Sequence, residues 1–508
     1  MKRFVTLLFF IMFLVAAGYA AKTKDLSGPM ALKGEFIKPY GNYPAGTPVI
    51  VRRVVKLHNS DPGQYGYDTY YAIEVNSTQT ALPAEELKLI KFYAPGNSEE
   101  LWQQIYVKQH LYEYFSENGY RKELRNQVDE ECMDYLDKVK SIAYNDDYIN
   151  SYVQSVFAKL SVSNIDPNRS ERLNVQVIQS PEPEAYMLPN GSMLVSTGLL
   201  CTLDSEDELA AIIANEMAHF VRDDQINNIY IAERNAKRAA FWGSVLAATA
   251  DAAFDVAYWD DNKKALGIGV VASIGSIATL INANVVDRLG MQYKLKQEFS
   301  ADEIAKSLIS LKGMNPDALS SALSKIVDYY ERQSKSNNLT RYSSTDDLKK
   351  RIEKAGEVHN IEARPYQKTV SDVITFNAQM EFANQRYAAA ARLIQKNIKT
   401  NLASDNDYVI LVKAKMALYN TEESNNDCLS LLQKAKELAG TSPNLDINKQ
   451  EILLLLRMNK QMQAAGALQD YLTLLTKYNE QGVKGDEQDW ATKEIGWAQQ
   501  LLTKISKI

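Results

Sequence analysis

The stretch of sequence that decides the fold is "DSEDELAAIIANEMAHFVRDD", residues 204–224. Each residue of an α-helix turns by about 100°, so Leu209, Ile212, Ile213, Glu216 and Phe220 fall on one face. Glu216 therefore lies in the middle of an apolar stripe. Burying a lone carboxylate is costly unless it is paired, hydrogen-bonded, protonated or next to a metal ion. The stretch predicts a helix that holds Glu216 against a specific partner.

Two polar side chains flank that stripe. Asn215 and His219 lie one helical turn apart, with Glu216 between them. Helices that bind zinc through two histidines at i and i+4 use this spacing, and the glutamate between the histidines acts as base on the metal-bound water. Here Asn215 stands at the first of the two histidine positions. By itself the pattern "NExxH" also suits an ordinary buried helix.

A second motif follows downstream in "KLKQEFSADEIAKSLI", residues 294–309. Glu298 and Asp302 lie one turn apart in another predicted helix with apolar neighbours. Glu298 could supply a carboxylate ligand to a metal. Asp302 could orient His219 through the second ring nitrogen, as acids behind metal-binding histidines do.

The segment before the first helix predicts a small sheet. Residues 173–178 and 192–196 read as strands, joined through Ala185, Tyr186 and Met187. The turn "LPNG" at residues 188–191 predicts a hairpin.

Taken together, "EAYMLPNGSMLVSTGLL", "DELAAIIANEMAH" and "EFSAD" occur in the order seen in one group of enzymes. They resemble the forty-eighth metallopeptidase family, which includes the CAAX prenyl endopeptidase, the HtpX-like membrane proteases and the BepA-like periplasmic proteases. The resemblance covers roughly residues 146–356. It implies one zinc ion and a polypeptide substrate.

The resemblance also implies a role for each matching residue. Glu216 matches the general base, His219 and Glu298 match zinc ligands, and Asp302 matches the acid behind the ligands. Ala185, Tyr186, Met187 and Leu188 match the edge strand along which substrate lies as an added β-strand.

The sequence departs from the family pattern at the metal. Asn215 stands where the family has its first zinc ligand, and an amide oxygen is a poor zinc donor. "LTRYSSTDDLKKRIEKAG", residues 339–356, lacks a histidine that BepA-like members often carry there, and Asp224 also stands at a position that is often histidine. The remaining histidines of the chain, His58, His110 and His359, lie outside the motifs.

The start of the chain predicts export. Residues 1–20 have the charged, apolar and small-residue layout of a signal peptide, although an uncleaved anchor is the alternative. Residues 28–93 alternate short strands with Pro, Gly and Asn turns, and weakly resemble bacterial SH3-like β-barrels. We place a metallopeptidase-like domain at residues 100–365, which begins with one or two helices.

The end of the chain predicts helical repeats. Residues 371–508 fall into helix pairs, with Tyr387, the "ESNN" break and Met462 recurring at a spacing near that of tetratricopeptide repeats. BepA-like relatives carry such repeats after the protease domain, and a non-repetitive helical domain is the alternative. Repeats of this kind imply protein partners.

Composition and charge bear on the binding partners, the disulfides and the membrane contacts that the chain could have. The net charge of −6 gives no general attraction to nucleic acid or anionic lipid. The three cysteines are too few and too scattered for a disulfide framework, so we expect them to pack in cores. Residues 265–286 carry no charge and are long enough to span a bilayer, but a buried small-residue hairpin is the interpretation we favour.

The sequence thus predicts an exported α+β protein. A β-barrel is followed by a mainly helical metallopeptidase domain of the gluzincin type with a small sheet, and then by tetratricopeptide-like repeats. Two functions stay open. The first is a zinc endopeptidase of the cell envelope that acts on unfolded or misassembled proteins, with catalysis weakened or lost through Asn215. The second is an inactive pseudopeptidase that serves as a binding or chaperone-like scaffold.

Overall fold

The computed structural model describes most of the 508-residue chain. The described residues are 23–58, 67–112, 119–161, 173–233, 277–278, 280–337, 339–359, 361, 363–440, 444–480 and 484–505. The chain divides into two compact units. The first comprises residues 1–128 with 160–171 and 307–314, and the second comprises 129–159, 172–306 and 315–508. The predicted signal peptide at residues 1–20 and most of the segment 265–286 lie outside the described residues.

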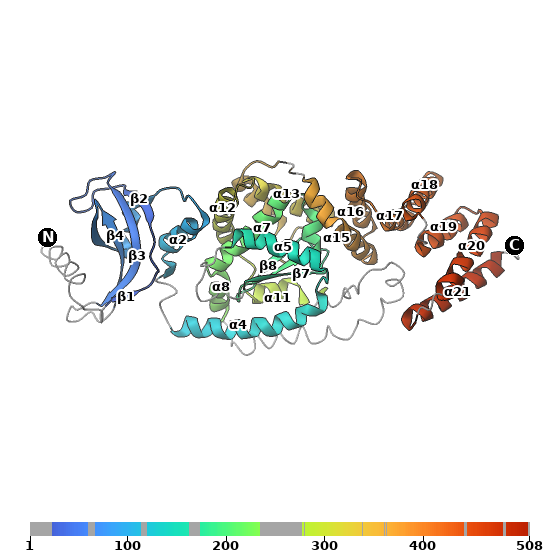
Figure 1. Ribbon diagram of the computed structural model, residues 1–508, viewed down its shortest axis with the longest axis horizontal. Coiled ribbons are helices and arrows are strands. Elements are labelled where there is room, and N and C mark those ends of the chain that lie inside the picture. Colours follow the sequence, from blue (N-terminus) through green and yellow to red (C-terminus); the bar gives the residue numbers. More distant parts are fainter. Residues whose placement is uncertain are drawn as a thin grey trace. The chain divides into compact units, whose positions relative to one another are not determined.

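The first unit contains an antiparallel sheet (Figure 1). Its strands are β1 (Thr23–Asp25), β2 (Leu32–Phe36), β3 (Pro48–His58), β4 (Tyr67–Val75), β5 (Thr78–Pro83) and β6 (Ile90–Phe92). The order is β5-β4-β3-β2-β6, and β1 pairs with β3. Alternate residues of β3 and β4, among them Val49, Val51, Tyr71 and Ile73, form an apolar core. The predicted strands are confirmed; β5 and β6 are not paired among the described residues, so barrel closure stays a prediction.

Helices follow the sheet as expected. In the first unit α2 (Ser98–Lys108) begins at Asn97, whose side chain accepts the backbone N–H of Glu100. Helix α4 (Gly119–Val139) comes next in the chain. The predicted helical segment 101–140 therefore contains two long helices.

The second unit is built around a three-stranded sheet of order β7-β9-β8. Strand β7 (Asn174–Ile178) runs parallel to β9 (Ser192–Ser196), and β8 (Ala185–Met187) runs antiparallel to β9. All residues of β8 and β9 are buried. Gly191 closes the predicted hairpin between them with a φ of +87°, a conformation that L side chains rarely adopt.

Helices cover this sheet. They are α5 (Asp147–Leu160), α6 (Thr197–Thr202), α7 (Glu206–Val221), α8 (Asp224–Glu233), α11 (Ala283–Arg288), α12 (Leu295–Leu311), α13 (Ala318–Arg332) and α14 (Thr345–Ala355). Helix α7 packs against both β8 and α13, and α14 packs on α13. The described part of the unit is thus mainly helical with a small sheet, as the sequence predicts.

Helix α7 is the central element. Ser205 caps its first turn by accepting the backbone N–H of Glu208, and acidic residues fill that turn. Every residue from Glu208 to Val221 is buried. The charged and polar side chains of the motif are therefore held inside the protein.

The second unit ends in a row of helices: α15 (Arg364–Ala383), α16 (Tyr387–Lys399), α17 (Asp405–Leu418), α18 (Glu422–Ala439), α19 (Leu445–Arg457), α20 (Gln461–Glu480) and α21 (Asp486–Ile505). Each packs on the next, which confirms the helical character of this region. One predicted break was wrong. "ESNN" lies within α18, because Thr421 caps that helix and Glu422 and Glu423 favour its first turn. The connection falls at residues 419–421 instead.

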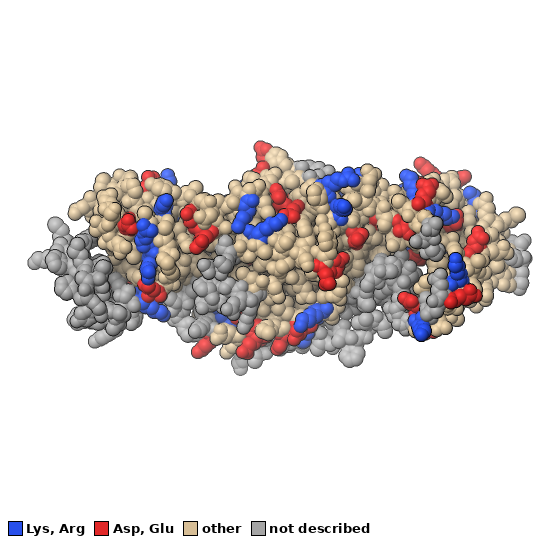
Figure 2. Space-filling model, viewed as in Figure 1, with Lys and Arg blue, Asp and Glu red and all other residues tan. Residues whose placement is uncertain are grey.

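Other sequence expectations can be checked on the described residues. Cys132, Cys201 and Cys428 are buried and form no disulfide among the described residues, as expected for packing residues. No described helix combines the length and the apolar character needed to cross a membrane. On the face shown in Figure 2, basic and acidic residues of the described part are interspersed, which fits the small net charge.

Candidate active site

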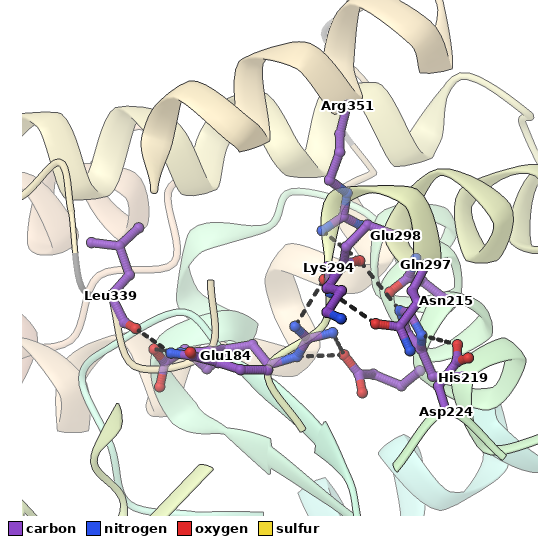
Figure 3. Close-up of polar contacts among 12 residues, drawn as sticks. Glu184, Asn215, His219, Asp224, Lys294, Gln297, Glu298, Leu339 and Arg351 are labelled. Atoms are coloured by element: carbon purple, nitrogen blue, oxygen red, sulfur yellow. Dashed lines mark hydrogen bonds and ion pairs between the residues drawn. The ribbon is translucent and has the colours of Figure 1, made fainter. Parts of the chain in front are cut away.

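The structure brings together the polar residues of the two sequence motifs. Asn215, Glu216 and His219 project from α7, while Glu298 and Asp302 project from α12; each is at most 5% exposed. Figure 3 shows Asn215, His219 and Glu298 close to one another. Since the two motifs lie on different helices, this proximity is produced by the packing of the second unit.

Asn215 bonds to the acid of the second motif. Its side-chain Nδ2 donates to Oδ1 of Asp302 at 2.8 Å. This contact fixes which way the amide faces, with its donor group toward α12. Asn215 therefore acts as a hydrogen-bond partner of Asp302.

His219 lies between two carboxylates. Its Nδ1 is 2.8 Å from Oδ2 of Asp224, and its Nε2 is 3.3 Å from Oε2 of Glu298 (Figure 3). Its ring also stacks on Tyr293 with 3.5 Å between centroids. Burial lowers the pKa of His219, but the hydrogen bonds to Asp224 and Glu298 outweigh burial and raise the pKa overall. The sequence interpretation assigned the orienting role to Asp302; in the structure the partner of Nδ1 is Asp224, the first residue of α8.

Arg341 fills the space between the two glutamates. Its Nε and Nη2 donate to Oε1 of Glu216 at 2.8 and 2.5 Å, and its Nη1 donates to Oε1 of Glu298 at 3.0 Å. The residue is 1% exposed, and its guanidinium lies over the Tyr293 ring at 4.5 Å from the centroid. One guanidinium thus joins a carboxylate of α7 to a carboxylate of α12.

The role of Arg341 was missed from sequence. It lies in a loop, 125 residues beyond Glu216, and no helical spacing links it to either motif. The available signal was chemical: a buried Glu216 needs a partner, and Arg341 lies two residues after apolar Leu339 in a segment that lacks histidine. A search for any cation could have found it.

A second buried arginine completes the cluster. Arg351 on α14 donates through Nε and Nη2 to the two oxygens of Asp302 at 2.9 and 2.7 Å. Its Nη1 is 2.9 Å from Oε2 of Glu298. Burial raises the pKa of Glu298, but Arg351 and Arg341 outweigh burial and hold that pKa well below its usual range. Glu298 is therefore a carboxylate with a cation on each oxygen.

The predicted substrate strand lies directly beside Glu216. The backbone N–H of Met187 in β8 donates to Oε2 of Glu216 at 3.2 Å, and its carbonyl accepts from Nε2 of Gln225 at 3.1 Å. β8 ends the described three-stranded sheet. Both backbone groups of Met187 that point away from β9 are therefore already bonded within the chain.

A buried carboxyl behind β8 holds the loop that carries Arg341. Oε1 of Glu184 accepts the backbone N–H of Arg341 at 3.1 Å and the hydroxyl of Tyr330 at 2.7 Å. The Tyr186 hydroxyl donates to the other oxygen. Burial, together with nearby Glu182, raises the pKa of Glu184 to about 7. Glu184 thus fixes the backbone at Arg341 while the guanidinium is fixed by Glu216 and Glu298.

These residues do not fit a zinc ion. Zinc sites use three or four donors such as imidazole nitrogens and carboxylate oxygens that converge on one point. Within the described residues, no group of three or more His, Cys, Asp or Glu side chains is arranged to hold a metal. The guanidinium of Arg341 stands between Glu216 and Glu298, and it would repel a divalent cation at contact distance by several kcal/mol.

The other histidines make different contacts. His110 bonds to the hydroxyl of Tyr71 in the first unit. His359, half exposed, lies 3.5 Å from carboxylate oxygens of Asp317 and Glu357. Space beside the cluster is small: a pocket of about 10 Å³ is lined in part by Tyr293, Glu298 and Arg351, which is room for about one water molecule.

The part of the chain that contains both site helices is similar to a family of metallopeptidases. Residues 147–380 match the profile of the family described as "Peptidase family M48". This segment includes α7, α12 and Arg341. The domain similarity predicted from the three motifs is therefore confirmed for this part of the chain.

Particular relatives match over shorter stretches. Mitochondrial metalloendopeptidase OMA1 of Schizosaccharomyces pombe is 29% identical over 98 residues, which is 19% of this chain and 24% of that protein. Protease HtpX of Idiomarina loihiensis is 28% identical over 147 residues, which is 28% of this chain and 47% of that protein. The chain thus spans less than half the length of either relative.

Proposed function

We propose that this protein carries a peptidase fold that does not hydrolyse peptide bonds and that it binds unfolded or misassembled polypeptides in the cell envelope. One observation carries the first part of the proposal. Glu216 is held by N–H donors within the chain: two from Arg341 on Oε1 and one from Met187 on Oε2. A general base has to direct a lone pair at the water that it activates, and here the guanidinium occupies Oε1 while the backbone N–H of Met187 already bonds to Oε2.

The rest of the site supports the same proposal. The matching position of the first zinc ligand is Asn215, which donates to Asp302. The guanidinium of Arg341 lies between Glu216 and Glu298, where a zinc ion would be expected. These contacts support neither step of peptide hydrolysis: neither the removal of a proton from water nor the polarisation of a carbonyl by an ion.

Binding is supported by features outside the cluster. The helical row from α15 to α21 exposes large apolar side chains, of which Tyr419, Leu438 and Met462 are 55%, 54% and 91% exposed. Exposed apolar side chains on stacked helices are typical of protein-binding surfaces. The predicted signal peptide at residues 1–20 supports an envelope location.

A second candidate function has its own support. The segment 147–380 matches a peptidase family, one relative is named a metalloendopeptidase, and Glu216, His219 and Glu298 are all retained. A zinc endopeptidase would have to open the Arg341–Glu216 pair before each turnover. The two candidate functions differ in whether the purified wild-type protein binds zinc and cleaves a polypeptide.

The deciding experiment measures zinc content and the cleavage of casein by the full mature chain. Wild type, Glu216→Gln and Asn215→His are compared. We expect no stoichiometric zinc and equal, background cleavage for wild type and Glu216→Gln. Stoichiometric zinc with cleavage that disappears in Glu216→Gln would refute the non-hydrolytic proposal.

Binding is tested separately with the same proteins. The wild type and Glu216→Gln should suppress the aggregation of a thermally unfolded client protein equally, measured by light scattering. Replacing Met462 by Ser, with exposed Lys399→Ser as the matched control, should reduce the suppression. Absence of any suppression by the wild type would remove the scaffold half of the proposal.

A further inference from the structure

We propose that Arg341 is an internal cation that takes the place of a metal ion, and that its removal lets Glu216, His219 and Glu298 rearrange around a divalent cation. The inference rests on the proposed loss of hydrolysis and extends it. It assigns a structural task to the residues that a peptidase would use for chemistry.

The first argument is geometric. A metal ion in such a site joins the ligands of two helices, and Arg341 performs the same joining through Glu216 on α7 and Glu298 on α12. Its planar fork of N–H donors suits two carboxylates at once. Among the described residues, Arg341 is the cation that forms an ion pair with Glu216, whereas Glu298 also pairs with Arg351.

The second argument is charge. Glu216, Asp224, Glu298 and Asp302 are four buried acids in one connected cluster. Arg341 and Arg351 are the buried arginines that contact three of them, and Arg222 lies 3.7 Å from the fourth. Burial lowers the pKa of Arg341, but Glu216 and Glu298 outweigh burial and raise it, so the guanidinium keeps its charge. Deleting Arg341 would leave buried negative charge without its cation, which is strongly unfavourable.

The third argument is that Arg341 is built into the site. Its backbone N–H is held by Glu184, and its guanidinium lies against the rings of Tyr293 and Tyr342 at 4.5 and 5.2 Å from their centroids. Such stacking suits a planar cation with few hydration requirements. The side chain is therefore positioned from both ends.

The guanidinium and a metal ion exclude each other. Both would bind the carboxylates of Glu216 and Glu298, and the two positive charges would repel each other at contact distance. With Arg341 shortened, these carboxylates and the His219 imidazole remain as a set of one nitrogen and two oxygen donors. Zinc and manganese both accept such donors.

The test compares thermal unfolding and bound metal in the wild type and Arg341→Ala. Each protein is treated with a chelator and then given Zn²⁺ or Mn²⁺, and excess metal is removed before metal analysis. We expect a wild-type Tm that does not respond to either treatment. Arg341→Ala should have a Tm lower by roughly 6 °C or more, regain part of it with metal, and retain about one ion per chain.

Two further variants show which residues bind the metal and whether the loss of any arginine has the same effect. Adding Glu216→Gln to Arg341→Ala should weaken metal binding by at least about tenfold, because one donor loses its charge. The matched control is Arg332→Ala, since Arg332 makes only an exposed pair with Asp328, with both side chains more than half exposed. It should leave the Tm nearly unchanged and gain no metal.

If Arg341→Ala does not fold without metal, refolding with and without Zn²⁺ provides the readout, and folding that depends on Zn²⁺ supports the inference. The inference is overturned when Arg341→Ala shows a wild-type Tm, or when it is destabilised and neither binds nor responds to metal. Zinc-dependent cleavage by the wild type would refute the proposed function together with the inference, whereas a zinc-free wild type beside an Arg341→Ala that ignores metal would refute the inference alone.

Discussion

At the scale of single residues, the site is a network in which each acid has a defined partner. Asn215 and Arg351 hold Asp302, Asp224 holds one nitrogen of His219, and Arg341 holds Glu216. In such a network, truncating one member leaves its partner buried and uncompensated. Each buried acid of the network therefore depends on the partner that holds it.

Glu184 predicts a pH dependence of stability. Its pKa is raised from 4.5 to about 7 in the folded state, so the folded protein keeps a proton that the unfolded chain has already released. The resulting stabilisation is complete below pH 4.5 and is lost as the pH rises through about 7, a loss of about 3 kcal/mol. Glu184→Gln lacks this titration.

The measurement is the free energy of unfolding by urea between pH 4.5 and 8. As the pH rises, the free energy of unfolding of the wild type should fall relative to that of Glu184→Gln. The other titrating groups are common to both proteins, so their contributions cancel in the comparison. Parallel pH profiles for the two proteins would contradict the raised pKa.

Sequence patterns predicted the neighbourhood of the site but not its cation. Asn215, Glu216 and His219 share a helix, and Glu298 and Asp302 share another, so helical spacing places each set on one face. Their mutual approach was inferred from family resemblance. The roles of Arg341 and Asp224 could not be predicted in this way, because a loop and the first residue of a helix have no such periodicity. Only the three-dimensional packing brings them to the site.

At the scale of elements, the β8–β9 hairpin depends on one glycine. Gly191 has a φ of +87°, and a Cβ there would lie 3.0 Å from Leu173 and 3.2 Å from Phe220. Gly191→Ala should therefore lower the free energy of unfolding by about 1–2 kcal/mol or more.

Gly466 provides the matched comparison. It lies inside α20, with nothing near the place of an added Cβ. Gly466→Ala should raise the free energy of unfolding by about 0.5–1 kcal/mol, because alanine favours a helix. Chemical denaturation of both variants checks the opposite signs, and a common sign would contradict the conformational argument.

Element types were easier to predict than their ends. Runs rich in β-branched and aromatic residues predicted β3 and β4, and the turn residues predicted the hairpin. The error at "ESNN" arose because Asn and Ser also occur in the first turns of helices. Thr421, as the capping residue, decides the boundary there.

At the scale of the whole molecule, the first helices of the row are tied to the peptidase-like part within the second unit. The hydroxyl of Tyr366 in α15 donates to the carbonyl of Leu200, and Thr197 bonds to Asn377. Lys396 in α16 contacts Oδ1 of Asp204 at 2.7 Å and the carbonyl of Cys201 at 2.6 Å. The family match ends at residue 380, inside α15. The end of the peptidase-like part and the start of the row therefore share a helix.

Lys396→Met tests this connection. The change removes a cation from the last carbonyls of α6, and it should cost roughly 1–2 kcal/mol. We expect faster amide hydrogen exchange in α15 and α16, while β7 and β9 change little. Exposed Lys399→Met on the same helix should leave exchange unaltered; equal exchange in the two variants would show that Lys396 is not a connection.

The Arg341 pair also has a pharmacological consequence. Hydroxamate inhibitors and the capture reagents derived from them bind metallopeptidases by chelating the active-site ion. A guanidinium has N–H donors and no vacant coordination position, so a hydroxamate cannot chelate it. We therefore expect that such reagents do not capture this protein from an extract that contains it, even though residues 147–380 match a peptidase family.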